Sequence, residues 1–365
     1  MFYWLSEVIQ EAGGPALFRY LTVRSVFAVI TAFLITLLVG RPLINALYRR
    51  GYRSAERSYG DINSASKAGT PVMGGVLLLI AGLGSAALWC DLSNAFVLAL
   101  FAASLWFAAM GALDDLFKVR RGDSDKGLSR PAKYFGQILF GLALGMIVVN
   151  QHTTPLPPAL ASELHVPFYK HALLDLGWVY VAFIVVVIVY SANAVNFADG
   201  MDGLAIVPSF FVLVVLGVFG YVLGNIKLTE YLFYPYIPGA GEVAVFCAAL
   251  GGAALGFLWF NAHPAEVFMG DTGSLFLGGA MGTAAVLLKQ EVLFVIAGGI
   301  FAAEILSTAI QEWIGLGLLR RRIFARAPIH HTFAHRGMAE TKVVVRFWIV
   351  SAILAAFAVA TLKIR

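Results

Sequence analysis

The 365-residue sequence contains little charge. Only 13% of its residues are Asp, Glu, Lys or Arg, about half the share that a soluble domain carries, whereas 60% are hydrophobic. So few charges cannot cover a globule of this size with polar surface. The composition therefore excludes a soluble fold with one domain or two, a coiled coil and intrinsic disorder.

Cysteine is also scarce, because Cys90 and Cys247 are the only two. They cannot form a disulfide framework and neither has metal-ligand spacing, so we interpret them as small apolar side chains. The dyad alternation of an outer-membrane barrel is missing as well. Glu7 and Glu11 precede the first apolar run and no small-residue cleavage site follows it, so we expect no cleavable signal peptide.

What the sequence has instead is long apolar runs. Runs of about 20 residues are long enough to cross a bilayer as helices. We therefore predict an all-α integral membrane protein, with one domain over residues 1–365. The ten predicted spans lie near residues 22–40, 72–90, 95–113, 133–150, 177–195, 204–223, 242–260, 272–288, 292–319 and 346–362.

The ninth predicted span is longer than a bilayer requires. As one helix its residues would extend ~42 Å, against a hydrocarbon core of ~30 Å. It also contains Glu304, Gln311 and Glu312 together with several glycines. We expect this helix to bend, to leave the bilayer in part, and to turn its polar face towards a cavity.

The distribution of basic residues predicts the orientation. Ten spans place both termini on one side, and the loops of the opposite side hold 19 of the 26 Lys and Arg. The positive-inside rule makes that opposite side cytoplasmic and both termini periplasmic. The net charge of +5 therefore reflects topology and not nucleic-acid binding. The Pro-rich segment 151–176 is predicted to be an outer loop with a small hairpin.

Acids, amides and glycines gather on the predicted cytoplasmic side, although orientation alone requires only positive charge there. Asp114 and Asp115 end the third span, where carboxylates oppose the helix macrodipole. A compensating cation is needed, and Lys118, Arg120, Arg121 or a divalent metal could supply it. The polar stretches cover residues 67–75, 111–118, 193–203, 260–274 and 327–335.

A polar stripe begins at the end of the fifth predicted span. It has one member at every third position: Asn193, Asn196, Asp199 and Asp202. Amides and carboxylates at the edge of a bilayer are costly unless they line a wet cavity. The stripe therefore favours a polar cavity on the cytoplasmic side.

Asp271 stands between two glycines at the start of the eighth predicted span. The N–H groups of a helix N-terminus attract phosphate, and a carboxylate there can hold a hard cation. The pattern indicates a phosphate bridged by a metal, and the oxygen-rich surroundings favour Mg²⁺. The simpler alternative is that Asp271, Thr272 or Ser274 caps the helix.

The histidines leave two interpretations open. His331 and His335 have the spacing of a zinc pair, but no third ligand is evident. A histidine cluster in an arginine-rich loop fits an anionic phosphate better.

These stretches resemble a known family. The segments 69–75 (GTPVMGG), 193–203 (NAVNFADGMDG), 258–261 (LWFN) and 327–331 (APIHH) are similar to the phospho-N-acetylmuramoyl-pentapeptide transferases, within the polyprenyl-phosphate N-acetylhexosamine-1-phosphate transferases. The resemblance covers nearly the whole chain. It implies a ten-helix, often dimeric protein with a cytoplasmic cleft in the bacterial inner membrane. Thr332 replaces the third histidine of the family's run, and His335 follows three residues later.

The resemblance also implies a reaction. Phospho-MurNAc-pentapeptide would move from UDP-MurNAc-pentapeptide to undecaprenyl phosphate, giving lipid I and UMP with Mg²⁺ as the cofactor. Asp271 would be the metal ligand, Asp114 and Asp115 the catalytic pair, and His330 an essential active-site residue. The positions that match the nucleotide and phosphate pocket are Lys67, Lys126, Lys133, Asn193, Asn196, Asp199, Asp202, Asn261, Phe268 and His331.

Other functions and mechanisms stay open at this point. A sister enzyme would transfer GlcNAc-1-phosphate to a polyprenyl phosphate, and the histidine pair argues against it. A secondary transporter would place its polar groups near the midplane at a repeat interface. Within the transferase class, we expect the lipid phosphate to attack the sugar-linked phosphorus directly. One of the paired aspartates would position or deprotonate the lipid phosphate. The alternative is a covalent phosphosugar-aspartate intermediate.

Overall fold

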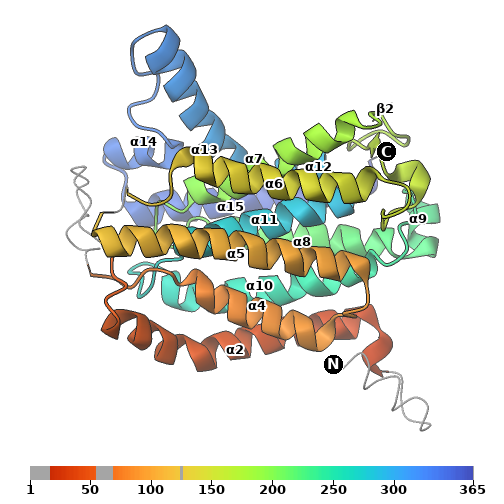
Figure 1. Cartoon of the computed structure of the whole chain (residues 1–365), viewed down its shortest axis with the longest axis horizontal. Coiled ribbons are helices and arrows are strands. Elements are labelled where there is room, and N and C mark those ends of the chain that lie inside the picture. Colours follow the sequence, from red (N-terminus) through yellow and green to blue (C-terminus); the bar gives the residue numbers. More distant parts are fainter. Residues whose placement is uncertain (1–16, 55–68, 124–125, 365) are drawn as a thin grey trace.

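The computed structural model describes residues 17–54, 69–123 and 126–364, and it is mainly helical (Figure 1). The long helices are α2 (Leu21–Arg49), α5 (Ala95–Arg121), α6 (Arg130–Val149), α7 (Val179–Ala198), α8 (Ile206–Leu223), α10 (Gly241–Asn261), α11 (Gly270–Leu287) and α15 (Glu340–Ala360). The shorter ones are η1 (Leu17–Arg19), α4 (Gly75–Trp89), η2 (Pro158–Leu160), α9 (Ile226–Leu232), α12 (Glu291–Ala297), α13 (Gly299–Ala309), the π-helix η3 (Ile310–Leu318) and α14 (Ile329–His335).

The predicted all-α membrane architecture is confirmed. Each predicted span coincides with a helix or, for the ninth, with a bent series of helices. Within the described part of the chain, seven helices are long and apolar enough to cross a membrane, and the bent series would be an eighth. The other two predicted spans are α4, with 15 residues, and the buried helix α11. The number of ten crossings stays a prediction.

Helix α11 occupies the centre of the bundle. Every residue from Asp271 to Leu287 is buried, and the helix packs against α4, α5, α7 and α8. Its glycines permit this close packing, since a Cβ on Gly278 would lie 2.5 Å from the carbonyl oxygen of Ser191 in α7. Small residues drive helix association in lipid, where the hydrophobic effect between helices is weak. The glycine-rich sequence of α11 thus explains its central place.

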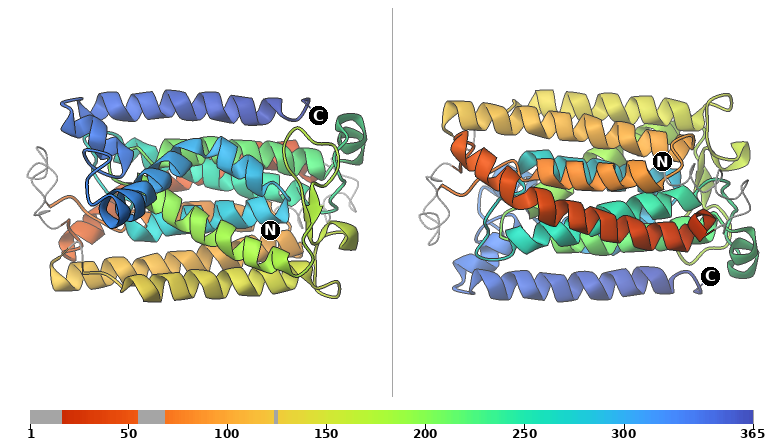
Figure 2. Two further views of the ribbon diagram at one scale, coloured as in Figure 1. Left: turned by 90° about the horizontal axis from the view of Figure 1, so that it is seen from above. Right: turned by 90° about the horizontal axis from the view of Figure 1, so that it is seen from below.

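The two ends of the bundle differ. The start of α2, the end of α15, α9 and β2 lie at one end, and α14 lies at the other (Figures 1 and 2). The predicted outer hairpin is present, because β1 (Glu163–Leu164) pairs antiparallel with β2 (Leu174–Asp175). Because α2 starts and α15 ends at the same end of the bundle, the described chain agrees with an even number of crossings. The assignment of that end to the periplasm stays a prediction from the distribution of charge.

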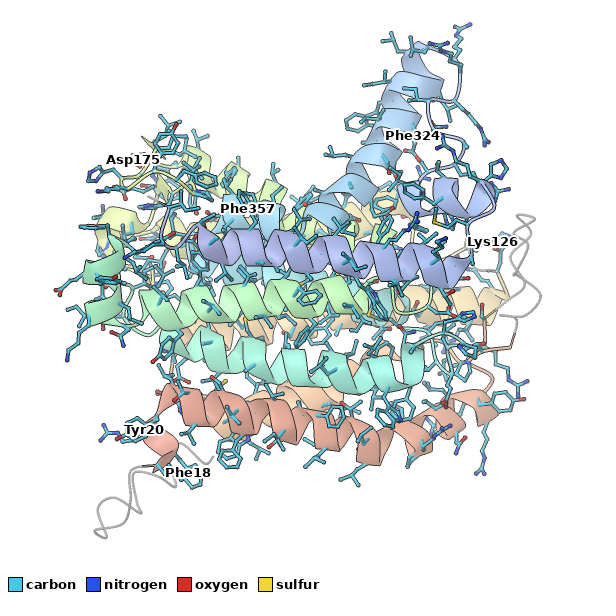
Figure 3. All side chains as sticks on the ribbon, turned by 180° about the vertical axis from the view of Figure 1, so that it is seen from behind. Phe18, Tyr20, Lys126, Asp175, Phe324 and Phe357 are labelled. Atoms are coloured by element: carbon cyan, nitrogen blue, oxygen red, sulfur yellow. The ribbon has the colours of Figure 1, made fainter. Side chains whose placement is uncertain are left out.

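The expected bend in the ninth segment is confirmed. Helix α12 meets the continuous α13 and η3 at an angle of 87°, with Gly298 at the break. The far part projects from the bundle, and Phe324 lies on the chain that returns from its tip (Figures 1 and 3). The side chain of Gln311 accepts hydrogen bonds from the backbone N–H groups of Ile323 and Phe324, both at 3.0 Å. This buried amide therefore fastens the returning chain to the projecting helix.

A buried ion pair joins α2 to α10 near the end that holds the termini. Arg24 donates to both carboxylate oxygens of Glu242, at 2.9 and 2.5 Å, and both side chains are buried. We predict that Glu242→Ala lowers the free energy of unfolding by about 3–5 kcal/mol, because Arg24 loses its carboxylate in a dry environment. The matched control is Glu266→Ala, which breaks an exposed pair with Arg41 and should cost less than about 1 kcal/mol. Thermal unfolding in detergent measures both, and equal losses would contradict the prediction.

A lysine is buried in the connection between α11 and α12. The ammonium of Lys289 lies 3.5 Å from the ring centroid of Tyr180, and its side chain is 0% exposed. Burial lowers the pKa of Lys289 from 10.5 to about 8, although nearby Glu291 opposes this shift. Between these two values the folded protein binds fewer protons than the unfolded chain. Its stability should therefore rise as the pH increases through that window, by about 3 kcal/mol over the whole of it.

The variant Lys289→Met separates this pH effect from the titration of other groups, because it removes the ammonium and keeps an apolar side chain of similar length. We expect the melting temperature of the wild type to gain more than that of the variant between pH 7.5 and pH 9.5. Equal gains in the two proteins would show that Lys289 is not the group responsible.

Candidate active site

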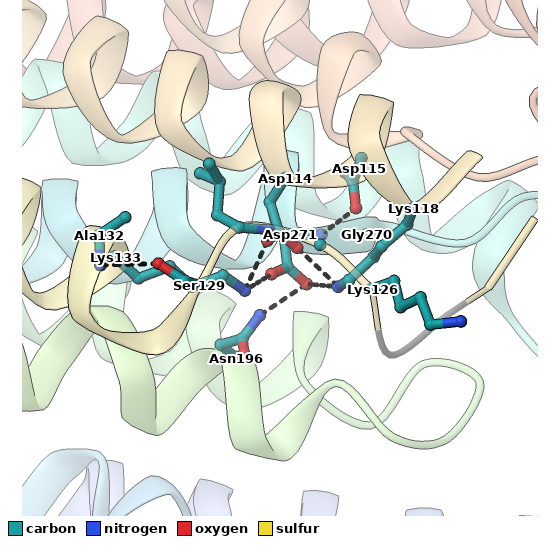
Figure 4. A network of polar contacts seen from close by, with 12 residues as sticks. Asp114, Asp115, Lys118, Lys126, Ser129, Ala132, Lys133, Asn196, Gly270 and Asp271 are labelled. Carbon is teal, nitrogen blue, oxygen red and sulfur yellow. Dashed lines mark hydrogen bonds and ion pairs between the residues drawn. The ribbon is translucent and has the colours of Figure 1, made fainter. Parts of the chain in front are cut away.

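Three helices, α5, α6 and α7, bring charged and polar side chains to Asp271, in the first turn of α11 (Figure 4). Its Oδ1 lies 3.0 Å from Nζ of Lys118 in α5 and 3.1 Å from Nδ2 of Asn196 in α7. Its Oδ2 lies 2.6 Å from Nζ of Lys133 in α6. The predicted residues Lys133, Asn196 and Asp271 are thus brought together.

Asp114 shares both lysines with Asp271. Its Oδ2 lies 2.7 Å from Nζ of Lys118, and its Oδ1 lies 2.9 Å from Nζ of Lys133. The backbone N–H of Leu128 also donates to Oδ1, at 2.6 Å. Two ammonium groups therefore bridge two carboxylates. The expectation that a cation compensates for acids at the end of the third span is confirmed by Lys118.

Asp115 has a different set of partners. Its Oδ1 accepts a hydrogen bond from the backbone N–H of Asp271 at 3.0 Å. Its Oδ2 accepts from the N–H and the hydroxyl of Thr272, at 2.9 and 2.6 Å. The close approach requires glycine at position 270, where φ is +69° and a Cβ would lie 2.6 Å from Oδ2 of Asp115. Asp115 thus satisfies the free N–H groups that begin α11.

This finding removes the alternative interpretation of a local cap on α11. The residue before the helix, Met269, provides no side-chain cap, and neither Asp271, Thr272 nor Ser274 fills that role. The capping carboxylate comes from Asp115, 156 residues earlier in the chain. Adjacent residues on a helix point about 100° apart, so Asp114 and Asp115 serve different partners.

The three carboxylates fit a divalent cation. Asp114, Asp115 and Asp271 each offer an oxygen within 4.8 Å of the others. Oxygen donors of this kind suit Mg²⁺, which commonly binds one or two carboxylates together with substrate phosphates. Lys118 and Lys133 balance only two of the three negative charges if all three are ionised. Within the described residues, this group of carboxylates could therefore hold a divalent cation such as Mg²⁺.

His330 approaches the same region from α14. The ring is 0% exposed, and a Cβ on Gly200 would lie only 2.2 Å from its Nε2. Gly200 directly follows Asp199, the C-cap residue of α7. The end of α7 therefore connects the acid and lysine cluster with His330. Asn196 donates a hydrogen bond to Asp271, and Gly200 lies against the ring of His330. The ring of His331 packs on that of His330, with 4.1 Å between centroids.

Three other predicted residues hold the end of α7 in place. Asn193 donates to Oε1 of Gln137 in α6 at 2.7 Å. Asp202 accepts from the backbone N–H of Ala265 at 3.3 Å, and its Oδ2 lies 2.9 Å from Nδ1 of His263. Asn261 accepts from the N–H of Gly203 at 3.1 Å. These contacts fix the loop between α7 and α8 against the segment after α10.

The segment after α10 is held in turn by the chain before α4. The backbone N–H of Phe268 donates to the carbonyl of Pro71, and its carbonyl accepts from the N–H of Gly74, both at 2.8 Å. Lys67, predicted to contact the substrate, lies outside the described residues.

The structure does not bring every predicted residue to the acids. Lys126 pairs with Asp123 at 3.0 Å, and Figure 4 shows its side chain pointing away from Asp271. Lys118, considered from the sequence only as a compensating cation, lies at the carboxylates instead. Within the described ranges, His331 and His335 belong to no group of acids, histidines or cysteines with metal-ligand geometry, so the zinc interpretation gains no support.

The chain is similar to known proteins over its whole length. Residues 97–289 match the family model described as glycosyl transferase family 4. Over 367 residues the chain is 42% identical to a phospho-N-acetylmuramoyl-pentapeptide-transferase of Maridesulfovibrio salexigens. Over 366 residues it is 45% identical to a protein of the same name from Desulfotalea psychrophila. Both alignments cover 100% of each chain.

The chain belongs to the phospho-N-acetylmuramoyl-pentapeptide transferase family. The resemblance inferred from its motifs is confirmed. The matched segment 97–289 contains α6, α7, α11 and nearly all of α5, and with them all members of the acid and lysine cluster. His330 lies beyond that segment but within the full-length alignments to the named family members. Family membership leaves the transporter without a supporting observation.

Proposed function

We propose that this chain transfers phospho-MurNAc-pentapeptide from UDP-MurNAc-pentapeptide to undecaprenyl phosphate, giving lipid I and UMP. The reaction takes place at the cytoplasmic face of a bacterial inner membrane, with Mg²⁺ held at Asp271 and the protein acting as a homodimer. The observation that carries the proposal is the cluster in which Lys118 and Lys133 bridge Asp114 and Asp271 at the end of an apolar bundle. Relatives with the name of this activity align with the whole chain.

The principal barrier to this reaction is the approach of two anions. A phosphate monoester has its second pKa near 6, so the attacking lipid phosphate is mostly dianionic at pH 7 and needs little help from a base. Lys118 and Lys133 are each about one quarter exposed, whereas Asp114 is buried behind them. Incoming phosphates therefore meet two ammonium groups first, and these attract and align them. Bound Mg²⁺ would neutralise further charge on the diphosphate.

Asp114 is the better candidate for the catalytic role in the aspartate pair. Both oxygens of Asp115 already accept hydrogen bonds from the start of α11, so its task is to fix Asp271. Oδ2 of Asp114 makes an ion pair with Lys118 and no further hydrogen bond within the described residues. Positional isotope exchange in the UDP-sugar, measured with UMP but without lipid acceptor, distinguishes direct attack from a covalent aspartate intermediate. Exchange favours the covalent route.

The decisive experiment uses purified protein in detergent with UDP-MurNAc-pentapeptide, undecaprenyl phosphate and Mg²⁺. We expect UMP release that depends on both substrates and stops with EDTA. A parallel reaction with UDP-GlcNAc tests the sister activity. Faster release from UDP-GlcNAc would overturn the proposed substrate, and transport of labelled substrate into proteoliposomes without UMP release would overturn the proposed reaction.

A further inference from the structure

Glu304 is a carboxylate inside the bent ninth segment that the proposed mechanism does not use. It lies on α13 after the 87° bend, and it is 0% exposed. An ionisable side chain buried within a membrane helix is costly, so it normally has a specific partner. The partner here is His330, whose Nδ1 lies 3.0 Å from Oε2 of Glu304.

This contact determines how the imidazole faces its surroundings. A carboxylate accepts hydrogen bonds, so the proton of the shared bond lies on Nδ1 of His330. The other ring nitrogen, Nε2, has no hydrogen-bond partner within the described residues and is buried. It points at Gly200, on the loop that follows α7. The pairing with Glu304 thus turns Nε2 towards the end of α7. The same end of α7 holds Asn196, which donates a hydrogen bond to Asp271.

We propose that Glu304 is a positioning residue for His330 in the transfer reaction. Its carboxylate holds the ring by Nδ1 and directs Nε2 at the phosphates of the bound substrate. It also stabilises the positive charge of the ring whenever Nε2 carries a proton to a phosphate oxygen, as carboxylates do behind other active-site histidines. The bend at Gly298 brings α13 to α14 and so places Glu304 beside His330. The inference rests on the proposed function.

The competing interpretation is that the pair only fastens α14 to the bundle. The two interpretations differ in how the effects of mutations combine. A residue that acts through His330 loses its influence when His330 is removed, whereas a residue that supports the fold keeps it. Glu304→Gln keeps the size of the side chain, and Glu304→Asp keeps its charge. Glu312→Gln is the matched control, because Glu312 is an exposed carboxylate on the same projecting segment.

The first test measures kcat and KM for UMP release. We expect Glu304→Gln to lower kcat by about 10- to 100-fold with little change in KM for the UDP-sugar, and Glu304→Asp to restore part of the loss. Glu312→Gln should match the wild type. In a His330→Gln background, Glu304→Gln should cause no further loss. Full activity of Glu304→Gln, or losses that multiply in the double variant, would overturn the proposal.

The second test does not depend on turnover. Nitrogen-15 NMR of histidine-labelled wild-type protein, with His330 assigned by comparison with His330→Gln, reports which ring nitrogens carry a proton. We expect a proton on Nδ1 of His330, and an unprotonated Nδ1 would overturn the proposal. If the wild type releases no UMP, the proposed function fails, and this measurement alone decides whether Glu304 sets the orientation of the ring.

Discussion

Asp271→Asn should reduce the rate of UMP release at least about 1,000-fold while the protein remains folded. The amide keeps the shape of the side chain but removes the charge that faces Lys118 and Lys133. It also removes the proposed ligand for Mg²⁺. Asp114 still pairs with both lysines in the variant, and Asp115 keeps a second carboxylate oxygen within 4.8 Å of Asp114, so two acids remain for the two ammonium groups. The measurement is a steady-state assay of UMP release at increasing Mg²⁺, with thermal unfolding recorded in parallel.

The control for this substitution is Asp123→Asn. Asp123 follows α5 and pairs with Lys126, which is largely exposed and points away from Asp271. That variant should keep wild-type activity and the wild-type response to Mg²⁺. If Asp271→Asn were as active as Asp123→Asn, the assignment of Asp271 to the metal would have to be abandoned.

Much of the fold could be predicted because a bilayer imposes simple rules on a sequence. Apolar runs of membrane length located the helices, and the excess length and glycines of residues 292–319 predicted a bend that lies at Gly298. The central position of α11 could not be predicted. It follows from close packing of its glycines against side chains and backbone of other helices, and the spacing of apolar residues in one helix does not contain that information.

Most candidate site residues could also be identified, but their partners could not. Asp115 contacts backbone N–H groups about 156 residues away, and every residue except proline has such a group, so the sequence contains no signal for that pairing. Lys118 and Lys126 are both basic residues after the third span. The helix continues to Arg121, which keeps Lys118 in phase with Asp114, whereas Lys126 follows the end of the helix. The contact between Glu304 and His330 likewise depends on the angle of a bend.

The second large effect is expected for Gly111→Ala. Gly111 lies on α5 one turn before Asp114, and a Cβ there would be 2.1 Å from the carbonyl oxygen of Asp271 and 2.6 Å from Cα of Thr272. Both neighbours are backbone atoms of α11, so no side chain can rotate away to make room. The two helices must separate at the place where Asp115 holds the start of α11. We expect a loss of about 1–3 kcal/mol in stability and at least about 100-fold in activity.

The matched control is Gly84→Ala, which we expect to raise stability and not to lower it. Gly84 lies inside α4, and the nearest atom to its added Cβ is Cδ1 of Ile35 at 3.8 Å, an ordinary contact. Alanine is a better helix former than glycine by about 1 kcal/mol, so Gly84→Ala should leave activity unchanged and raise the melting temperature slightly. Because the same methyl group is added inside a helix in both variants, a difference between them reports the approach of α5 to α11. If Gly111→Ala kept both activity and stability, the positions of the carboxylates would not depend on the close approach of α5 to α11. The arrangement described around Asp271 would then be wrong.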